Sequence, residues 1–333
     1  MIKGRGYFLI AQELSDLSKD KLNKLTVEDL DNLSYEELEQ YYKELEKTLP
    51  YDQRIDNVDI SNDFMFCHVM QDKEIFAEVL HRILPELDIG RVEFCEYQKT
   101  LSEYIDMQGV RFDVYAKTKS DGEIKVFDVE MQKVNKDSLA KRARYYHALM
   151  TSNIMNRAEI KNYKDLPDEF VIFICKFDLF GQGRSIYEFE NLCRQDTNLS
   201  LGDGTRTIFV NADSSDENIS PELKNFLNFI MGGTSSDPFI KKLEKIVYIA
   251  KQRPEWRINY MKMLMRDSLK LEEGIAIGER RGERRGIIKG TRLGERKANF
   301  ATAKKMLSAG IKISEIMKFT DLSLEDLNSL QQA

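Results

Sequence analysis

Two strands joined by a tight turn restrict the folds open to this chain more than any other feature. Residues 110–117 alternate strictly between Val110, Phe112, Val114 and Ala116 on one side and Arg111, Asp113, Tyr115 and Lys117 on the other. Asp121 and Gly122 then suit the positive φ angles of a hairpin turn, and residues 124–132 return as the partner strand. We therefore expect a sheet at the centre of the molecule rather than a purely helical fold.

The segments around this hairpin predict helices and further strands. A helix beginning near Asp63 and ending at Pro85 comes first, and residues 170–174 form a continuous apolar run typical of a strand covered on both faces. Further strands are expected at 92–99, 186–190 and 205–210, and helices at 136–160, 221–231, 238–251 and from 255 onward. This order predicts a mixed α/β core with a helical C-terminal arm.

The chain divides into three predicted parts. Residues 1–50 contain leucines at helical spacing among charges and form a helical N-terminal extension, to which we assign no chemistry. Residues 51–233 hold the strands and form the core. Residues 234–333 form the helical arm, which ends in three short helices at 299–309, 314–319 and 323–330 that resemble a small helix-turn-helix.

The arm carries a glycine at every fourth position. These residues are Gly274, Gly278, Gly282, Gly286, Gly290 and Gly294. Each glycine costs a helix about 1 kcal/mol relative to alanine, so the repeat requires a reason. Close approach of a second helix is one reason and predicts self-association, while an arginine-rich, weakly ordered linker is the other reading.

Charge is distributed unevenly along a chain whose formal net charge is −6. Residues 131–164 contain eight Lys or Arg against two acids, and residues 274–312 contain eleven against three. Two basic zones on an acidic chain indicate a polyanionic partner, although each zone alone also fits a solvated helix face.

The cysteines and the apolar segments exclude several other classes of protein. The four cysteines are widely spaced, without a CxxC pair, so neither a zinc site nor a disulfide framework is expected. The N-terminus shows no signal-peptide pattern, and the apolar runs are too short to span a bilayer. We expect a cytoplasmic protein without a membrane partner.

A row of polar side chains on the second hairpin strand points to chemistry. Phe127, Val129 and Met131 form the apolar side of this strand, which leaves Asp128, Glu130 and Gln132 together on the other side. Asp113 faces the same way if the hairpin register places the polar faces of the two strands together. Carboxylates gathered on one sheet face repel one another unless a cation or protons compensate them, and Mg²⁺ favours such oxygen ligands. A solvated sheet face is the alternative reading of the same alternation.

The spacing of these residues resembles a known nuclease signature. Arg111-Phe-Asp113-Val-Tyr, followed after sixteen residues by Glu130-Met-Gln132, is similar to the D…ExK motif of the PD-(D/E)XK nuclease superfamily. It resembles more closely the recombination-promoting nuclease and transposase family, in which glutamine commonly replaces the motif lysine. Asn62-Asp63-Phe-Met-Phe66, Arg142-Ala-Arg144-Tyr-Tyr146 and the glycine-rich arm resemble further features of that family. The resemblance covers 56–233 and the arm.

The resemblance implies a fold, a cofactor and roles for individual residues. The fold would be restriction-endonuclease-like, with a mixed sheet flanked by helices. Asp113, Glu130 and the backbone carbonyl of Met131 would hold Mg²⁺, or Mn²⁺ in its place. Gln132 would orient the attacking water without supplying positive charge. Asp128 shares the face of Glu130, either as a supporting group or as a solvated neighbour.

Residues on two helices complete the predicted site. Asp63 would be an upstream acid that helps to hold metal or water, or else a simple helix N-cap. Lys141, Arg142 and Arg144 would contact DNA phosphates, or else only decorate the exposed side of their helix.

Three functional hypotheses follow. The first is a metal-dependent DNA endonuclease that hydrolyses phosphodiester bonds and promotes recombination of mobile DNA, with DNA as partner and a homo-oligomer formed through the C-terminal arm. The second is a catalytically inactive DNA-binding or self-assembling protein on the same core. The third is an interaction protein that uses the glycine repeat and the acidic helices. Metal binding by Asp113 and Glu130 separates the first hypothesis from the others.

Overall fold

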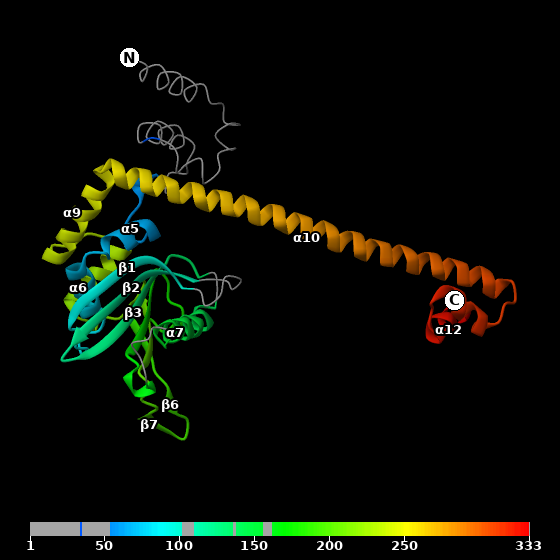
Figure 1. The fold of residues 1–333 in the computed structure, drawn as a ribbon, viewed down its shortest axis with the longest axis horizontal. Coiled ribbons are helices and arrows are strands. Elements are labelled where there is room, and N and C mark those ends of the chain that lie inside the picture. Colours follow the sequence, from blue (N-terminus) through cyan, green and yellow to red (C-terminus); the bar gives the residue numbers. More distant parts are fainter. Residues whose placement is uncertain (1–33, 35–53, 102–109, 136–137, 156–161, 333) are drawn as a thin grey trace, which may run out of the picture. The chain divides into compact units, whose positions relative to one another are not determined.

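The computed structural model describes Ser34 and residues 54–101, 110–135, 138–155 and 162–332. Except for Ser34, the predicted N-terminal extension lies outside the described residues. The chain forms two compact units, one containing the described residues up to Met263 and the other those from Leu264 onward (Figure 1).

A six-stranded sheet forms the centre of the first unit, in the order β1-β2-β3-β4-β8-β5. The strands are β1 (Arg91–Leu101), β2 (Val110–Ser120), β3 (Glu123–Gln132), β4 (Asp168–Cys175), β5 (Ile186–Phe189) and β8 (Thr205–Asn211). β1, β2 and β3 are antiparallel, β3, β4 and β8 are parallel, and β5 runs antiparallel to β8. The predicted mixed α/β core is thus confirmed.

The predicted hairpin is the β2–β3 pair. Asp121 and Gly122 adopt φ angles of 47° and 91°, as the tight turn requires. The register pairs Ser120 with Glu123 and continues to Val114 opposite Val129. This register places the end of β2 that carries Asp113 beside the end of β3 that carries Glu130.

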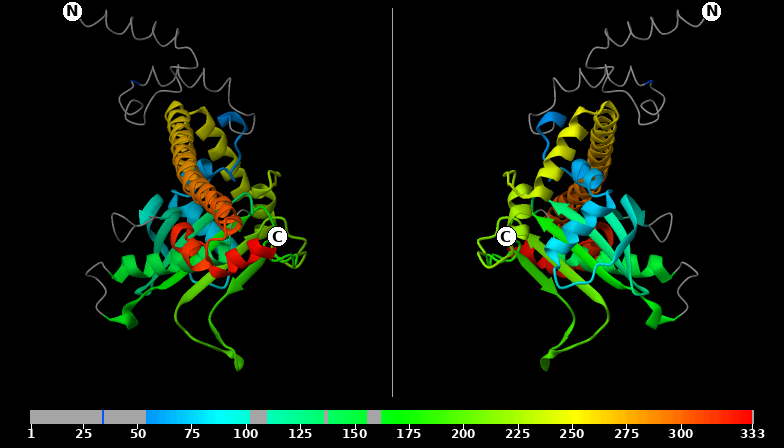
Figure 2. Two further views of the ribbon diagram at one scale, coloured as in Figure 1. Left: turned by 90° about the vertical axis from the view of Figure 1, so that its right-hand side faces the viewer. Right: turned by 90° about the vertical axis from the view of Figure 1, so that its left-hand side faces the viewer.

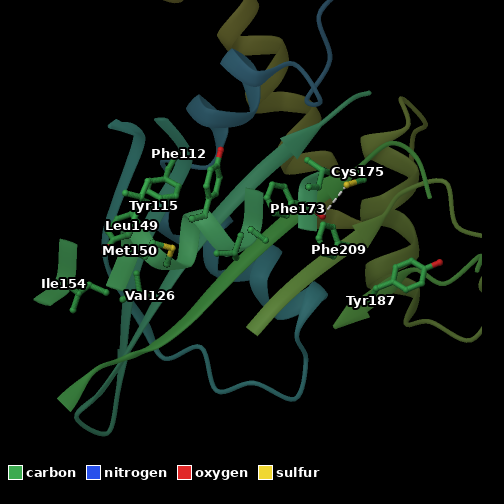
Figure 3. Close-up of a cluster of buried hydrophobic side chains, with 14 residues drawn as sticks. Phe112, Tyr115, Val126, Leu149, Met150, Ile154, Phe173, Cys175, Tyr187 and Phe209 are labelled. Carbon is green, nitrogen blue, oxygen red and sulfur yellow. Dashed lines mark hydrogen bonds between the residues drawn. The ribbon is translucent and has the colours of Figure 1, made fainter. Parts of the chain in front are cut away.

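Helix α7 (Leu139–Met155) covers one face of the sheet. Its apolar side packs into a core cluster that contains side chains of β2, β3, β4 and β8 (Figure 3). Phe112 belongs to the same cluster as Tyr115, and its ring meets that of Tyr146 edge on at 4.9 Å. The alternation predicted for β2 puts Phe112 and Tyr115 on opposite faces of the sheet, so it is wrong at Phe112. Phe112 lies beyond Val114, which is the last residue of β2 that pairs with β3.

Two short helices pack against β1 and β2, where the sequence predicted one long helix. They are α5 (Asp63–Val69) and α6 (Lys73–Ile83). The side chain of Asp72 accepts hydrogen bonds from the backbone N–H groups of Glu74 and Ile75, so it caps the start of a second helix. The Sγ of Cys67 donates to the carbonyl of Asp113 at 3.4 Å, which fixes α5 beside β2.

Two further helices complete the first unit, together with the start of α10. α8 (Pro221–Ile230) packs against α6, and α9 (Pro238–Gln252) packs against α5 and α8. The rings of Phe64 and Tyr260 lie 5.2 Å apart, so the first turns of α10 also pack on α5. Two short 3-10 helices, η2 (Ile55–Asn57) and η3 (Tyr163–Asp165), lie in the connections.

A two-stranded hairpin, β6 (Leu192–Cys193) and β7 (Asp196–Ser200), was not predicted. It projects from the first unit beyond the six-stranded sheet (Figure 2). All five residues of β7 are exposed, so no hydrophobic alternation marks this strand in the sequence.

The second unit consists of a long helix and a small helical tail. α10 (Pro254–Ser308) runs without a break through all six glycines of the repeat, so neither the predicted separate helix at 299–309 nor a disordered linker is present. α11 (Ile313–Thr320) and α12 (Leu324–Gln332) pack on the end of α10 around a small core. This core contains Ala303, Ile316, Leu322 and Leu327.

All four cysteines are free thiols, and Cys67 and Cys175 are buried. Among the described residues, no helix combines the length and the apolar character needed to cross a membrane.

Candidate active site

Asp113 and Glu130 lie side by side where β2 and β3 begin to separate. The backbone N–H of Asp113 donates to Oε1 of Glu130 at 2.9 Å. The backbone N–H of Met131 in turn donates to Oδ2 of Asp113 at 3.0 Å. Each carboxylate is thus held by the backbone of the opposite strand, and the structure brings together the two acids that the sequence pattern selected.

The polar side of β3 is buried rather than solvated. The side chains of Asp128 and Glu130 are both 0% exposed because α7 lies across this face of the sheet. The alternative reading of the row as a solvated sheet face is therefore wrong. Burying carboxylates is unfavourable unless they are paired, protonated or bound to a cation, so this burial needs compensation.

Arg142 on α7 provides the nearest positive charge. Its Nη2 lies 2.6 Å from Oε2 of Glu130, and its Nη1 lies 3.4 Å from Oε1 of Gln132. Its Nε donates to the hydroxyl of Tyr146 at 2.5 Å, and its guanidinium stands 4.9 Å from the centre of the Tyr146 ring. The arginine is therefore directed into the site rather than outward.

Among the described residues, Asp128 has no partner comparable to Arg142. Neither of its carboxylate oxygens accepts a hydrogen bond from a donor group of the described residues. Burial raises the pKa of Asp128 well above its usual range, and the neighbouring Glu130 and Asp113 raise it further. Either a proton shared with Glu130 or a nearby cation would remove this unfavourable charge.

The pKa values of the other two acids of the site, Asp113 and Glu130, are also raised. Burial raises the pKa of Asp113, and the charges of Glu130 and Asp63 add to the rise. Burial also raises the pKa of Glu130, while the Arg142 guanidinium opposes that rise. Without a compensating cation, the carboxyl groups at the end of β2 and β3 therefore favour their protonated forms.

Asp63 lies at the start of α5 without acting as its cap. The N-cap is Asn62, whose side chain accepts hydrogen bonds from the backbone N–H groups of Phe64 and Met65. The simple N-cap reading of Asp63 is therefore wrong. Its charge acts on both Asp113 and Glu130, which agrees with a position beside the acidic pair.

Gln132 occupies the motif position that the superfamily usually gives to lysine. Arginine can only donate hydrogen bonds, so its contact with Oε1 leaves the amide N–H groups of Gln132 for another acceptor. Lys176 directly follows β4, and its backbone N–H donates to the carbonyl of Gln132 at 3.0 Å. Its Nζ, however, lies 3.6 Å from Asp59 and 3.5 Å from Ser61.

The basic residues predicted to contact DNA separate into two groups. Arg142 is half-buried against Glu130, whereas Lys141 and Arg144 are exposed on other sides of α7. Arg144 lines an open pocket of about 380 Å³ beside the β5–β8 edge, and none of the site carboxylates lines that pocket.

Sequence analysis missed the pairing of Arg142 with Glu130 and the polar role of Tyr146. The available signal was their spacing of four residues, which places Arg142 and Tyr146 on one side of a helix. That spacing does not say which side faces the sheet.

The residues at this site offer oxygen ligands, which a hard divalent cation prefers. Asp113 and Glu130 offer carboxylate oxygens, Met131 offers a backbone carbonyl, and the uncompensated carboxylate of Asp128 adds negative charge. No group of three or more His, Cys, Asp or Glu side chains in the described part of the chain is arranged around a metal position. A cation here would therefore rely on two carboxylates and the backbone.

A mixed sheet flanked by helices, with paired acids at the diverging ends of two adjacent strands, defines a restriction-endonuclease-like α/β protein. Residues 60–265 match the family described as PD-(D/E)XK nuclease family transposase, and the chain belongs to this family. The resemblance inferred from the motifs is thereby confirmed. Searches among curated proteins and among solved structures gave no match.

Proposed function

We propose that this protein is a metal-dependent endonuclease that hydrolyses phosphodiester bonds in DNA and so promotes recombination of mobile DNA. The observation that carries the proposal is the pair formed by the half-buried Asp113 and the buried Glu130, which are held together by hydrogen bonds to the backbone of β2 and β3. Family membership supports a nuclease or transposase role, and the site supports hydrolysis.

Asp113, Glu130 and the carbonyl of Met131 would hold Mg²⁺, and Mn²⁺ could replace it because both ions take oxygen ligands. The ion would supply Lewis acidity, which makes water a better nucleophile and neutralises charge on the scissile phosphate. Asp63 and Asp128 would support this set by adding negative charge beside it.

The side chains opposite the acids would position the substrate. Gln132 presents its amide N–H groups, which can donate to a phosphate oxygen or to the oxygen of the attacking water. We propose that Arg142 supplies the positive charge that Gln132 lacks, because its guanidinium already contacts both Glu130 and Gln132. Lys141 and Arg144 would contact phosphates farther from the scissile bond.

Nicking of supercoiled plasmid in Mg²⁺ or Mn²⁺ tests this proposal. The variants Asp113→Asn and Glu130→Gln keep the shape of each side chain and remove its charge. We expect both variants to lose at least about 10²-fold in rate, since charge stabilisation of this kind is worth that much in other enzymes. A well-folded wild type that binds DNA and never cuts it would instead favour the inactive DNA-binding protein.

We also propose that the C-terminal arm forms a homo-oligomer through its glycines. A Cβ added at any glycine of the repeat would meet nothing within 4 Å, so packing within the described chain does not require these glycines. Neighbouring members of the repeat lie about 40° apart around the helix, so Gly282, Gly286 and Gly290 share one side.

Alanine substitutions separate this role from simple helix propensity. The triple variant Gly282→Ala, Gly286→Ala, Gly290→Ala should gain helix propensity of about 1 kcal/mol per position. If the glycines admit a second chain, light scattering should nevertheless show a smaller particle than the wild type. An unchanged particle mass would show that the glycines do not lie in an oligomer interface.

A further inference from the structure

One side of α10 carries a continuous row of basic side chains, which we name the basic face. Its members are Arg281, Arg285, Lys289, Arg292 and Arg296. Their spacing of four, four, three and four residues places them within a sector of about 80° over roughly 22 Å of helix. Every residue from 281 to 298 is exposed, so these side chains reach solvent.

The charge of the basic face is largely uncompensated. Within the described residues, no ion pair involves Arg281, Arg285, Lys289 or Arg292, and only Arg296 has one, with Asp326 at 3.0 Å. By the same geometry Glu279 and Glu283 lie about 120° and about 160° from the centre of the basic face, and Glu295 lies about 80° from it, at its border. The row therefore concentrates positive charge on a chain whose formal net charge is −6.

We infer that the basic face binds the sugar–phosphate backbone of duplex DNA, an inference that rests on DNA being the substrate of the proposed nuclease. Successive cations lie about 6 Å apart along the helix, and each DNA strand carries one negative charge per about 3.4 Å of its axis. Long Lys and Arg side chains can therefore each reach a phosphate. Such contacts hold a protein on DNA without reading its sequence.

A second copy of the chain is a poorer occupant of this face. Two basic faces would bring like charges together, whereas the glycines proposed to admit a second chain lie elsewhere. Gly282, Gly286 and Gly290 point roughly 60° to 140° away from the centre of the basic face. Self-association through the glycines and DNA binding through the basic face can thus occur on one helix.

Two triple variants of equal charge test the inference. Arg285→Gln, Lys289→Gln and Arg292→Gln remove the centre of the basic face. Arg280→Gln, Arg284→Gln and Lys297→Gln remove the same charge from other sides of α10, and glutamine preserves helix propensity in both. Binding of the full-length variants to a fluorescent 30-base-pair duplex of random sequence would be measured by anisotropy, in EDTA, over a series of salt concentrations.

We expect the variant of the basic face to bind at least about tenfold more weakly near 0.1 M salt than the control variant. Its slope of log affinity against log salt should shrink by about 2 to 3, because each lost phosphate contact removes about 0.9. Circular dichroism should show equal helix content in the wild type and in both variants.

Three outcomes would overturn the inference. The first is that the wild type does not bind the duplex. The second is that both triple variants lose the same amount of DNA affinity, or that neither loses any. The third is a lower particle mass in light scattering for the variant of the basic face alone, which would assign that face to a second copy of the chain. Binding is measured in EDTA and therefore does not depend on cleavage. A wild type that binds the duplex but never cuts DNA would contradict the nuclease proposal without contradicting the DNA-binding role of the basic face.

Discussion

The acids at the end of β2 and β3 outnumber the cations that face them. The β2–β3 register and the position of α7 bring three acids together, Asp113, Asp128 and Glu130. Among the described residues, Arg142 is the one cation found in contact with them. Folding this cluster is unfavourable unless a proton or a bound cation compensates it. The excess of acids over cations makes the cluster unfavourable in isolation, and the same excess favours a positively charged ligand.

Arg142 therefore has two roles that can be separated. It neutralises Glu130 in the structure, and in the proposed reaction its positive charge would face the phosphate. We predict that Arg142→Gln lowers the nicking rate at saturating Mg²⁺ by about 10²-fold, the usual cost of one lost charge-stabilising donor.

Lys176→Gln is the matched control for this prediction. It removes one positive charge near Gln132, but the Nζ of Lys176 is directed toward Asp59 and Ser61. Most of the wild-type rate should remain in this variant. If Lys176→Gln is the more damaging change, the lysine rather than Arg142 supplies the charge that the motif glutamine lacks.

The sequence identified Asp113, Glu130 and Gln132 as candidates because the alternation of β3 and the resemblance to the D…ExK motif both read directly from the residues. It left open whether Asp128 and Glu130 are solvated, because that depends on where α7 lies. It likewise could not show that Arg142 faces Glu130 whereas Arg144 does not. Both answers come from helix-on-sheet packing, which sequence periodicity does not fix.

At the level of elements, buried strands and the hairpin turn were predictable, and exposed or interrupted elements were not. The β6–β7 hairpin has no apolar pattern, and the helix at 63–83 is divided at Asp72 although its apolar spacing continues. α10 passes through six glycines that intrinsic propensity disfavours. At Asp72 the local cap outweighs the hydrophobic pattern.

Asp237 joins two helices of the first unit. It caps α9 by accepting from the N–H groups of Phe239 and Ile240, and its carboxylate forms a bidentate pair with Arg82 of α6. The two side chains are 6% and 8% exposed. Without Asp237, Arg82 would keep its ion pair with Glu78 at 2.8 Å but would lose the bidentate partner of its buried charge.

We predict that Asp237→Ala lowers the free energy of unfolding by about 3 kcal/mol, the lower end for a broken buried pair, because Arg82 keeps its ion pair with Glu78. Asp72→Ala is the matched control, because Asp72 caps α6 without a buried arginine and its loss should cost about 1 kcal/mol. Urea unfolding followed by circular dichroism measures both values. Equal losses would mean that the pair with Arg82 contributes nothing beyond the cap.

At the scale of the whole molecule, the chain combines a unit built on the six-stranded sheet with a second unit built on the long helix α10. The first unit has its own core on both sides of the sheet and contains every residue of the proposed active site. The second unit has a separate small core and the basic face. We propose that chemistry belongs to the first unit, and that assembly and additional DNA affinity belong to the arm.

Deleting residues 274–333 tests this division. The truncated chain keeps the first turns of α10, including Tyr260, so its core packing should persist and its thermal transition should remain cooperative. It should nick plasmid at a similar maximal rate but require more DNA to reach half of that rate, because the basic face is absent. Its mass in light scattering should correspond to a smaller assembly. A folded truncated chain that cannot cut at any DNA concentration would show that the arm completes the active site, whereas an unchanged DNA requirement would confine binding to the first unit.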